Sequence, residues 1–133
     1  MKKTLMIAAA AAFAVGGLTV APEAQAAVWG KCQACHNFTD ANKVGPGLGK
    51  GPSAPGVFGR KAGTHPDFRY SDSLKDGGWT WDEAHLRKWM CSSKDAIKEF
   101  TGKADAKTKM PPQKVCDTAQ QDEVLAKLKD ISK

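Results

Sequence analysis

Two cysteines and a histidine fall within five consecutive positions of this chain, in the stretch KCQACHNF that begins at position 31. The pattern Cys32-x-x-Cys35-His36 constrains the fold strongly, because all three side chains lie on about one turn of backbone and must face the same bound group. Such a pattern serves three kinds of site: half of a zinc site, a redox-active dithiol, or the covalent attachment of a haem.

The remaining sequence favours the haem. A zinc site needs a second pair of ligands, and the other two cysteines, Cys91 and Cys116, are far apart in the sequence. A redox dithiol would need a βαβ context, and the chain has few strand-like runs. In the haem interpretation each thiol adds to a vinyl group, and the adjacent His36 turns its imidazole toward the iron. The motif therefore predicts one covalently attached haem c.

The first 26 residues resemble a secretory signal peptide. A Lys-Lys pair at positions 2–3 precedes an apolar run at 5–20 and then the small-residue site AQA at 24–26. The run is shorter than the roughly 20 residues that span a bilayer. We expect cleavage after Ala26, export to the periplasm, and one mature domain at 27–133 that meets a membrane only through partner complexes.

Charge narrows the choice of partners. The chain has 20 basic and 14 acidic residues, giving a formal net charge of +6. A basic surface steers encounters with acidic proteins. The basic residues are not interleaved with aromatic ones as in nucleic-acid modules, so we expect no nucleic-acid partner.

The pattern of apolar and capping residues predicts an all-α domain of short helices joined by loops rich in glycine and proline. The first expected helix begins at Ala27 and runs through the haem motif. The others span 71–76, 80–91, 94–101 and 118–131. Capping boxes at Thr80-x-x-Glu83 and Thr118-x-x-Gln121 open two of them. The last helix places apolar residues on one face, at positions 124, 125, 128 and 131.

Six stretches in this order resemble the class I c-type cytochromes of the soluble mitochondrial and bacterial kind: CQACH, NKVGPGL, GVFGRKAG, FRYS, GGWTWDEAHL and TKMPP. The resemblance covers nearly all of the expected mature chain. It implies the small cytochrome c fold around one haem, with His36 as the proximal iron ligand and Met110 as the distal ligand. Methionine opposite histidine raises the reduction potential of the iron.

The resemblance also implies the surroundings of the haem. Pro46 would offer its carbonyl to the second ring nitrogen of His36, which orients the ring and raises its basicity. Arg60, Tyr70 and Trp81 match positions that donate hydrogen bonds to the haem propionates.

Other residues compete for the ligand role. Met90 lies beside Leu86 on a predicted helix, where methionine usually fills the core. His65 falls in a Gly/Pro-rich region and is expected to be exposed, whereas His85 is expected to pack between tryptophans.

The chain departs from the family pattern in three places. Only residues 27–31 precede the haem motif, so the N-terminal helix is shortened. The segment GKGPSAP looks inserted after the motif. The stretch between Cys91 and position 109 is long and contains an extra cysteine. In an oxidising compartment we expect Cys91 and Cys116 to form a disulfide, the alternative being two separately buried thiols.

These observations predict a monomeric one-electron carrier, not an enzyme, that exchanges electrons with a reductase or terminal oxidase bearing an acidic docking surface. Two alternatives remain from the sequence. One is a haem-based sensor or peroxidase-like protein whose sixth iron position is open or labile. The other is a haem subunit of a larger oxidoreductase complex.

Overall fold

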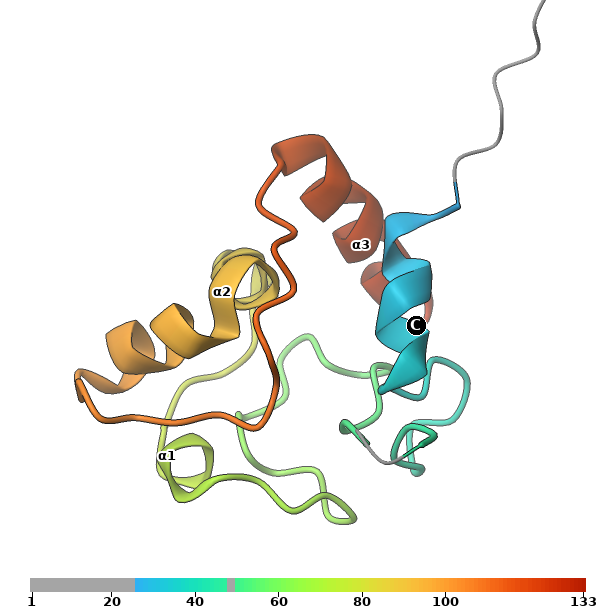
Figure 1. Cartoon of the computed structure of the whole chain (residues 1–133). Helices are drawn as coiled ribbons and strands as arrows, with labels where there is room; N and C mark the ends of the chain where they lie inside the picture. The colour runs from blue at the N-terminus through green and yellow to red at the C-terminus, as the bar shows by residue number, and fades with distance from the viewer. Residues whose placement is uncertain (1–25, 48–49) are drawn as a thin grey trace, which may run out of the picture.

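The computed structural model describes residues 26–47 and 50–133. Almost all of the expected signal peptide lies outside this part. Four helical elements follow one another along the chain: η1 (Val28–Ala34), α1 (Asp72–Lys75), α2 (Glu83–Thr101) and α3 (Thr118–Asp130). Long loops connect them, and Figure 1 shows these loops filling the lower half of the molecule. The described residues contain no sheet beyond one isolated bridge between Lys61 and Thr80, so the predicted all-α class is confirmed.

The short first element packs on the last one. η1 is a 3-10 helix, and Figure 1 shows it lying alongside α3. The main-chain N–H of Val28 donates to Glu123 Oε1 at 2.7 Å. The ring of Trp29 stacks on Phe38 and carries the ammonium of Lys127 at 4.8 Å from its centroid. Val28 and Trp29 therefore hold η1 against α3.

Aspartates, rather than the expected threonines, cap the two longer helices. Asp82 accepts a hydrogen bond from the main-chain N–H of His85, and Asp117 accepts one from Gln120. The predicted capping boxes at Thr80 and Thr118 were therefore wrong in register, because a carboxylate preceding the first helical residue is available to satisfy the free N–H groups.

The two helices expected at 80–91 and 94–101 form a single element, α2, with a kink at Ser92, whose φ of −146° and ψ of 92° are non-helical. The kink frees two carbonyls from the helix. The Met90 carbonyl accepts from Val115 N–H at 3.1 Å, and the Cys91 carbonyl accepts from Lys114 N–H at 3.0 Å. The predicted disulfide between Cys91 and Cys116 is present beside these bonds.

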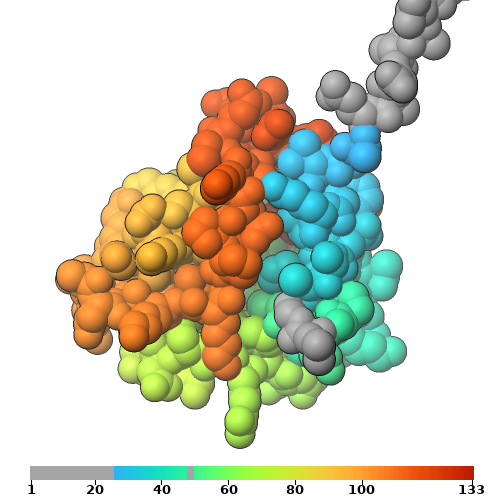
Figure 2. Space-filling view, viewed as in Figure 1, coloured from blue at the N-terminus to red at the C-terminus, as the bar shows by residue number. Residues whose placement is uncertain are grey.

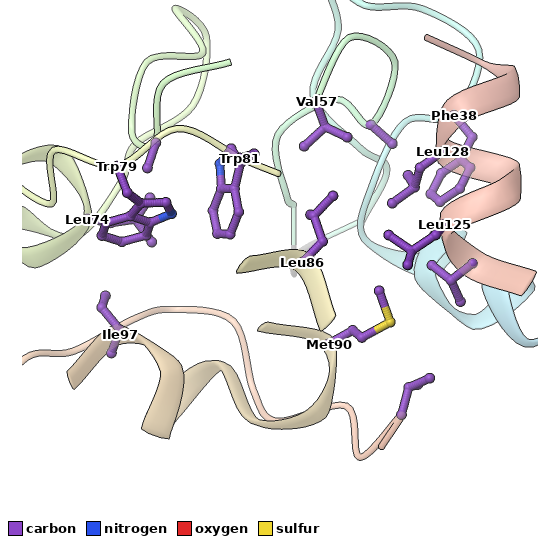
Figure 3. Close-up of a cluster of buried hydrophobic side chains, with 14 of the residues drawn as sticks. Phe38, Val57, Leu74, Trp79, Trp81, Leu86, Met90, Ile97, Leu125 and Leu128 are labelled. Carbon is purple, nitrogen blue, oxygen red and sulfur yellow. The ribbon is translucent and has the colours of Figure 1, made fainter. Parts of the chain in front are cut away.

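The core lies between α2, α3 and the loops. Figure 3 shows Leu86 and Met90 of α2, Leu125 and Leu128 of α3, and Val57 and Trp81 of the loops directed into a common interior. In Figure 2 the segment that links α2 to α3 crosses the visible face between α2 and η1. No helix in the described part is both long and apolar enough to cross a membrane.

Candidate functional site

A cavity of about 720 Å³ opens within this core. Cofactor sites in proteins commonly enclose 300–1,000 Å³. The predicted attachment residues Cys32 and Cys35 line it, and so do the predicted iron ligands His36 and Met110, the latter from the segment before α3. Most of the remaining wall is apolar and comes from every part of the described fold: Phe38, Val57, Leu74, Trp81, Leu86, Trp89, Met90, Val124 and Leu128.

His36 is held in the orientation that a metal ligand needs. Its Nδ1 lies 2.8 Å from the carbonyl oxygen of Pro52. A carbonyl only accepts, so Nδ1 carries the proton and Nε2 keeps its lone pair for a metal. Burial, helped by the nearby charge of Arg60, lowers the pKa of His36 despite the opposing effect of the Pro52 bond. Burial and the charge of Arg60 thus favour the neutral imidazole, which is the form that binds a metal.

The expectation that Pro46 supplies this carbonyl was wrong, because Pro46 is exposed and Pro52 takes the position. The backbone before Pro52 passes close to the haem motif, with Gly51 N–H donating to the Cys35 carbonyl at 2.6 Å. A Cβ on Gly51 would come 2.5 Å from the His36 ring, so only glycine allows this approach.

The sequence contains two Gly-Pro pairs, at 45–46 and 51–52, and only the second runs directly on into the stretch GVFGRKAG through three residues. This continuity with GVFGRKAG was the sequence feature that could have indicated Pro52 in place of Pro46. The segment GKGPSAP is therefore not an insertion remote from the site. It contains Pro52, whose carbonyl oxygen orients the ring of His36.

Cys32 and Cys35 are free thiols that are half-buried in the cavity wall. Burial is the main cause that raises the pKa of Cys32, so this side chain stays a protonated thiol. Addition of such an S–H across a vinyl double bond forms one C–S and one C–H bond and requires no other redox partner. The two thiols are chemically suited to form thioether links.

Met110 is held at the edge of the cavity by two contacts from α2. Its sulfur accepts a hydrogen bond from Trp89 Nε1 at 3.0 Å, and its carbonyl accepts one from Ser93 Oγ at 2.8 Å. Met90 also reaches the cavity, but it is a buried member of the α2 core. Neither Trp89 nor Ser93 belongs to a motif recognised in the sequence, so no role was predicted for either.

The three residues expected on the propionate side, Arg60, Tyr70 and Trp81, all line the same cavity. The Arg60 guanidinium is partly buried and donates to the Ser53 carbonyl at 2.8 Å, yet it pairs with no acidic side chain of the described residues. Burial lowers the pKa of Arg60 and raises the pKa of Tyr70. A desolvated cation beside hydrogen-bond donors fits a carboxylate of a bound group.

Comparisons with known proteins agree with this arrangement. No protein-family model matches the chain. Cytochrome c2 from Cereibacter sphaeroides is 38% identical over 96 residues, covering 67% of this chain and 77% of that protein. The crystal structure of cytochrome c2 from Rhodobacter sphaeroides has a TM-score of 0.68 at 33% identity, covering 79% of this chain and 90% of the other. The structure of ferric cytochrome c-550 from Paracoccus versutus has a TM-score of 0.65 at 33% identity, covering 79% of this chain and 92% of the other.

A helical fold built around a cavity that presents two thiols, an oriented imidazole and a thioether defines a c-type cytochrome. The chain belongs to the cytochrome c2 and cytochrome c-550 family of class I monohaem cytochromes. Proteins of this family are electron carriers and not enzymes, and membership implies a covalently attached haem c.

Proposed function

We propose that this chain is a one-electron carrier whose single haem c is bonded to Cys32 and Cys35 and whose iron is ligated by His36 and Met110. The observation that carries the proposal is the convergence of these four side chains on one apolar cavity. When bound, the haem supplies an iron that alternates between the ferrous and ferric states.

The chain supports this function by keeping the ligands in place in both oxidation states. The Pro52 carbonyl orients the ring of His36, and Ser93 holds the backbone of Met110. The apolar wall excludes water from the iron, which limits the reorganisation that accompanies each transfer. No catalytic base is required, because no proton is moved and no substrate binds the metal.

The rim of the cavity is basic. Lys31, Lys50, Arg69 and Lys109 all line it, against one acidic residue among those the structure describes, Asp67. Lys31 and Lys109 donate to the carbonyls of Gln113 and Arg69, which keeps both ammonium groups at the rim. We propose a redox partner, a reductase or terminal oxidase, with an acidic docking surface, approached by a monomer in the periplasm.

The test is the absorption spectrum of the full chain matured in a bacterial periplasm. We expect low-spin haem c in both oxidation states, a ferric sulfur-to-iron charge-transfer band, and no rapid binding of carbon monoxide to the ferrous protein. High-spin iron that binds carbon monoxide at once would instead indicate the sensor or peroxidase-like alternative. Recovery of the native protein only in a larger complex would indicate the subunit alternative.

A further inference from the structure

His65 is buried, with only 4% of its surface exposed, whereas the sequence predicted an exposed loop residue. Both ring nitrogens make hydrogen bonds to the main chain. Nε2 lies 3.1 Å from the Ala41 carbonyl, and Nδ1 accepts the main-chain N–H of Asp67 at 3.3 Å. Because a carbonyl only accepts and an N–H only donates, these partners specify the neutral tautomer with its proton on Nε2. The imidazole thus ties the segment 65–67 to the loop that follows the haem motif.

The Ala41 carbonyl is shared with a second buried side chain. Ser53 is 1% exposed, and its hydroxyl donates to the same carbonyl at 2.7 Å. The carbonyl of Ser53 accepts from Arg60, and the residue before it, Pro52, orients the proximal His36. One carbonyl therefore joins His65 to the backbone that positions both the iron ligand and the arginine of the cavity wall.

His65 also reaches the cavity through its own backbone. Its main-chain N–H points at the Tyr70 hydroxyl oxygen at 3.4 Å. This contact uses the hydroxyl as an acceptor, so the O–H hydrogen remains available to donate in another direction. Tyr70 lines the cavity, and its ring makes an edge contact with Phe68, which also lines the cavity, at 4.7 Å between centroids.

We propose that His65 is a positioning residue that sets the reduction potential by holding Tyr70 and Arg60 where they donate to a haem propionate. This inference rests on the proposed haem site. A propionate that loses a donor keeps more of its negative charge near the iron, which favours the ferric state and lowers the potential. His65 does not touch the cofactor itself. It acts through the Ala41 carbonyl and the Tyr70 hydroxyl.

The test uses three variants of His65 in the matured, haem-containing chain. Glutamine places an amide donor near the position of Nε2 and keeps the bond to Ala41. Asparagine places an acceptor near Nδ1 and keeps only the bond from Asp67. Leucine removes both. We expect a threefold fall in the equilibrium constant for reduction of the haem in the leucine variant, which is a potential lower by about 28 mV at 59 mV per tenfold change. Asparagine should resemble leucine, and glutamine should restore the potential.

A double-mutant cycle separates positioning from general loosening. Tyr70→Phe removes the hydroxyl through which His65 acts, so His65→Leu should shift the potential much less in that background. Thr64→Val is the matched control, because it removes one bond to the Lys61 carbonyl on the same segment without touching Ala41 or Tyr70. It should leave the potential unchanged.

Equal shifts from His65→Leu in both backgrounds, or asparagine rescuing while glutamine does not, would overturn the inference. Because glutamine and asparagine differ by one methylene, their order remains decisive even if the leucine variant fails to mature. Failure of the wild-type chain to carry a covalent haem would instead overturn the proposed function.

Discussion

The side chains that face the cavity are oriented by bonds made elsewhere in the same residue. His36 is fixed through Nδ1, which leaves Nε2 for the metal, and Met110 is fixed through its carbonyl, which leaves the thioether on a restrained stem. Such contacts tune a metal centre, because they fix the orientation of each donor group and raise its basicity.

Met110 is expected to be the distal iron ligand. Met110→Ala should expose the iron to cyanide and carbon monoxide, abolish the sulfur-to-iron band and lower the potential, because a soft thioether stabilises ferrous iron. Met90→Leu is the matched control, since it substitutes a buried core thioether on α2 with a side chain of similar volume, at a cost of less than about 1.5 kcal/mol. Loss of the band in the Met90 variant alone would reverse the assignment.

Trp89 is expected to modulate that ligand. Its Nε1–H lies 3.0 Å from the Met110 sulfur, and a hydrogen bond to sulfur withdraws electron density from the thioether. Trp89→Phe keeps an aromatic ring but removes the donor, so the sulfur becomes a stronger donor to ferric iron and the potential should fall while the iron stays low-spin. Voltammetry measures the shift. A potential equal to that of the wild type would show that the indole bonds elsewhere when haem is present.

The predicted haem-binding residues could be named from the sequence because their motifs are short, whereas the residues that contact them could not. Cys32, Cys35 and His36 lie within five positions, and Met110 directly precedes two prolines. The choice of Pro52 over Pro46 depends on which Gly-Pro pair can approach an imidazole ring, a close backbone contact that neither pair displays in its letters. His65 was placed on the surface because Gly/Pro-rich surroundings are usually loops, although this loop is packed.

At the level of elements, hydrogen bonds and a disulfide join α2 to the segment that follows it. The kink at Ser92 turns the carbonyls of Met90 and Cys91 toward residues 114–115, and the disulfide to Cys116 closes the same junction. The sequence predicted two helices with a break between positions 91 and 94, and the kink lies within that break. Lys114 and Val115, whose N–H groups bond these two carbonyls, are remote from the kink in the sequence.

The disulfide is expected to restrain the distal ligand. It joins residues 25 positions apart and closes a loop that contains Met110. Loss of chain entropy in the unfolded state would make such a bond stabilise the fold by about 3.5 kcal/mol. The Cys91→Ser/Cys116→Ser variant should unfold at lower denaturant and should exchange Met110 for added imidazole faster than the wild type. Stopped-flow absorbance follows the exchange. Equal exchange rates with reduced stability would leave the bridge as a general constraint on the fold.

Acid is expected to weaken the start of α2. The hydrogen bond from the His85 N–H is the main cause that lowers the pKa of Asp82 below its ordinary value of 3.8. A carboxylate with a depressed pKa in the folded state stabilises the fold above its ordinary pKa and loses that effect as the pH falls through the folded value. Asp82→Asn should retain the cap but flatten this part of the acid unfolding curve, as followed by circular dichroism. A curve unchanged from the wild type would contradict the assignment.

For the molecule as a whole, the all-α class and the last helix followed from the periodicity of apolar residues, which is a property of short stretches. The cavity did not, because it exists only where η1, α2, α3 and the loops meet. A small domain that surrounds such a cavity buries less apolar surface in its own contacts than its size permits. Its stability should therefore depend on the group that fills the space.

Haem attachment is expected to complete the fold. Mass spectrometry of the exported protein should show a chain that begins at Ala27 and carries one haem that survives acid denaturation. Cys32→Ser/Cys35→Ser should yield a haem-free chain whose main-chain amides around the cavity are less protected from hydrogen exchange. The reason is that a ligand that binds only the folded state stabilises it. The Cys91→Ser/Cys116→Ser chain is the matched control, because it also loses two sulfurs yet should retain the haem. Tightly bound zinc in the wild type, or full protection in the haem-free chain, would contradict a fold built around haem.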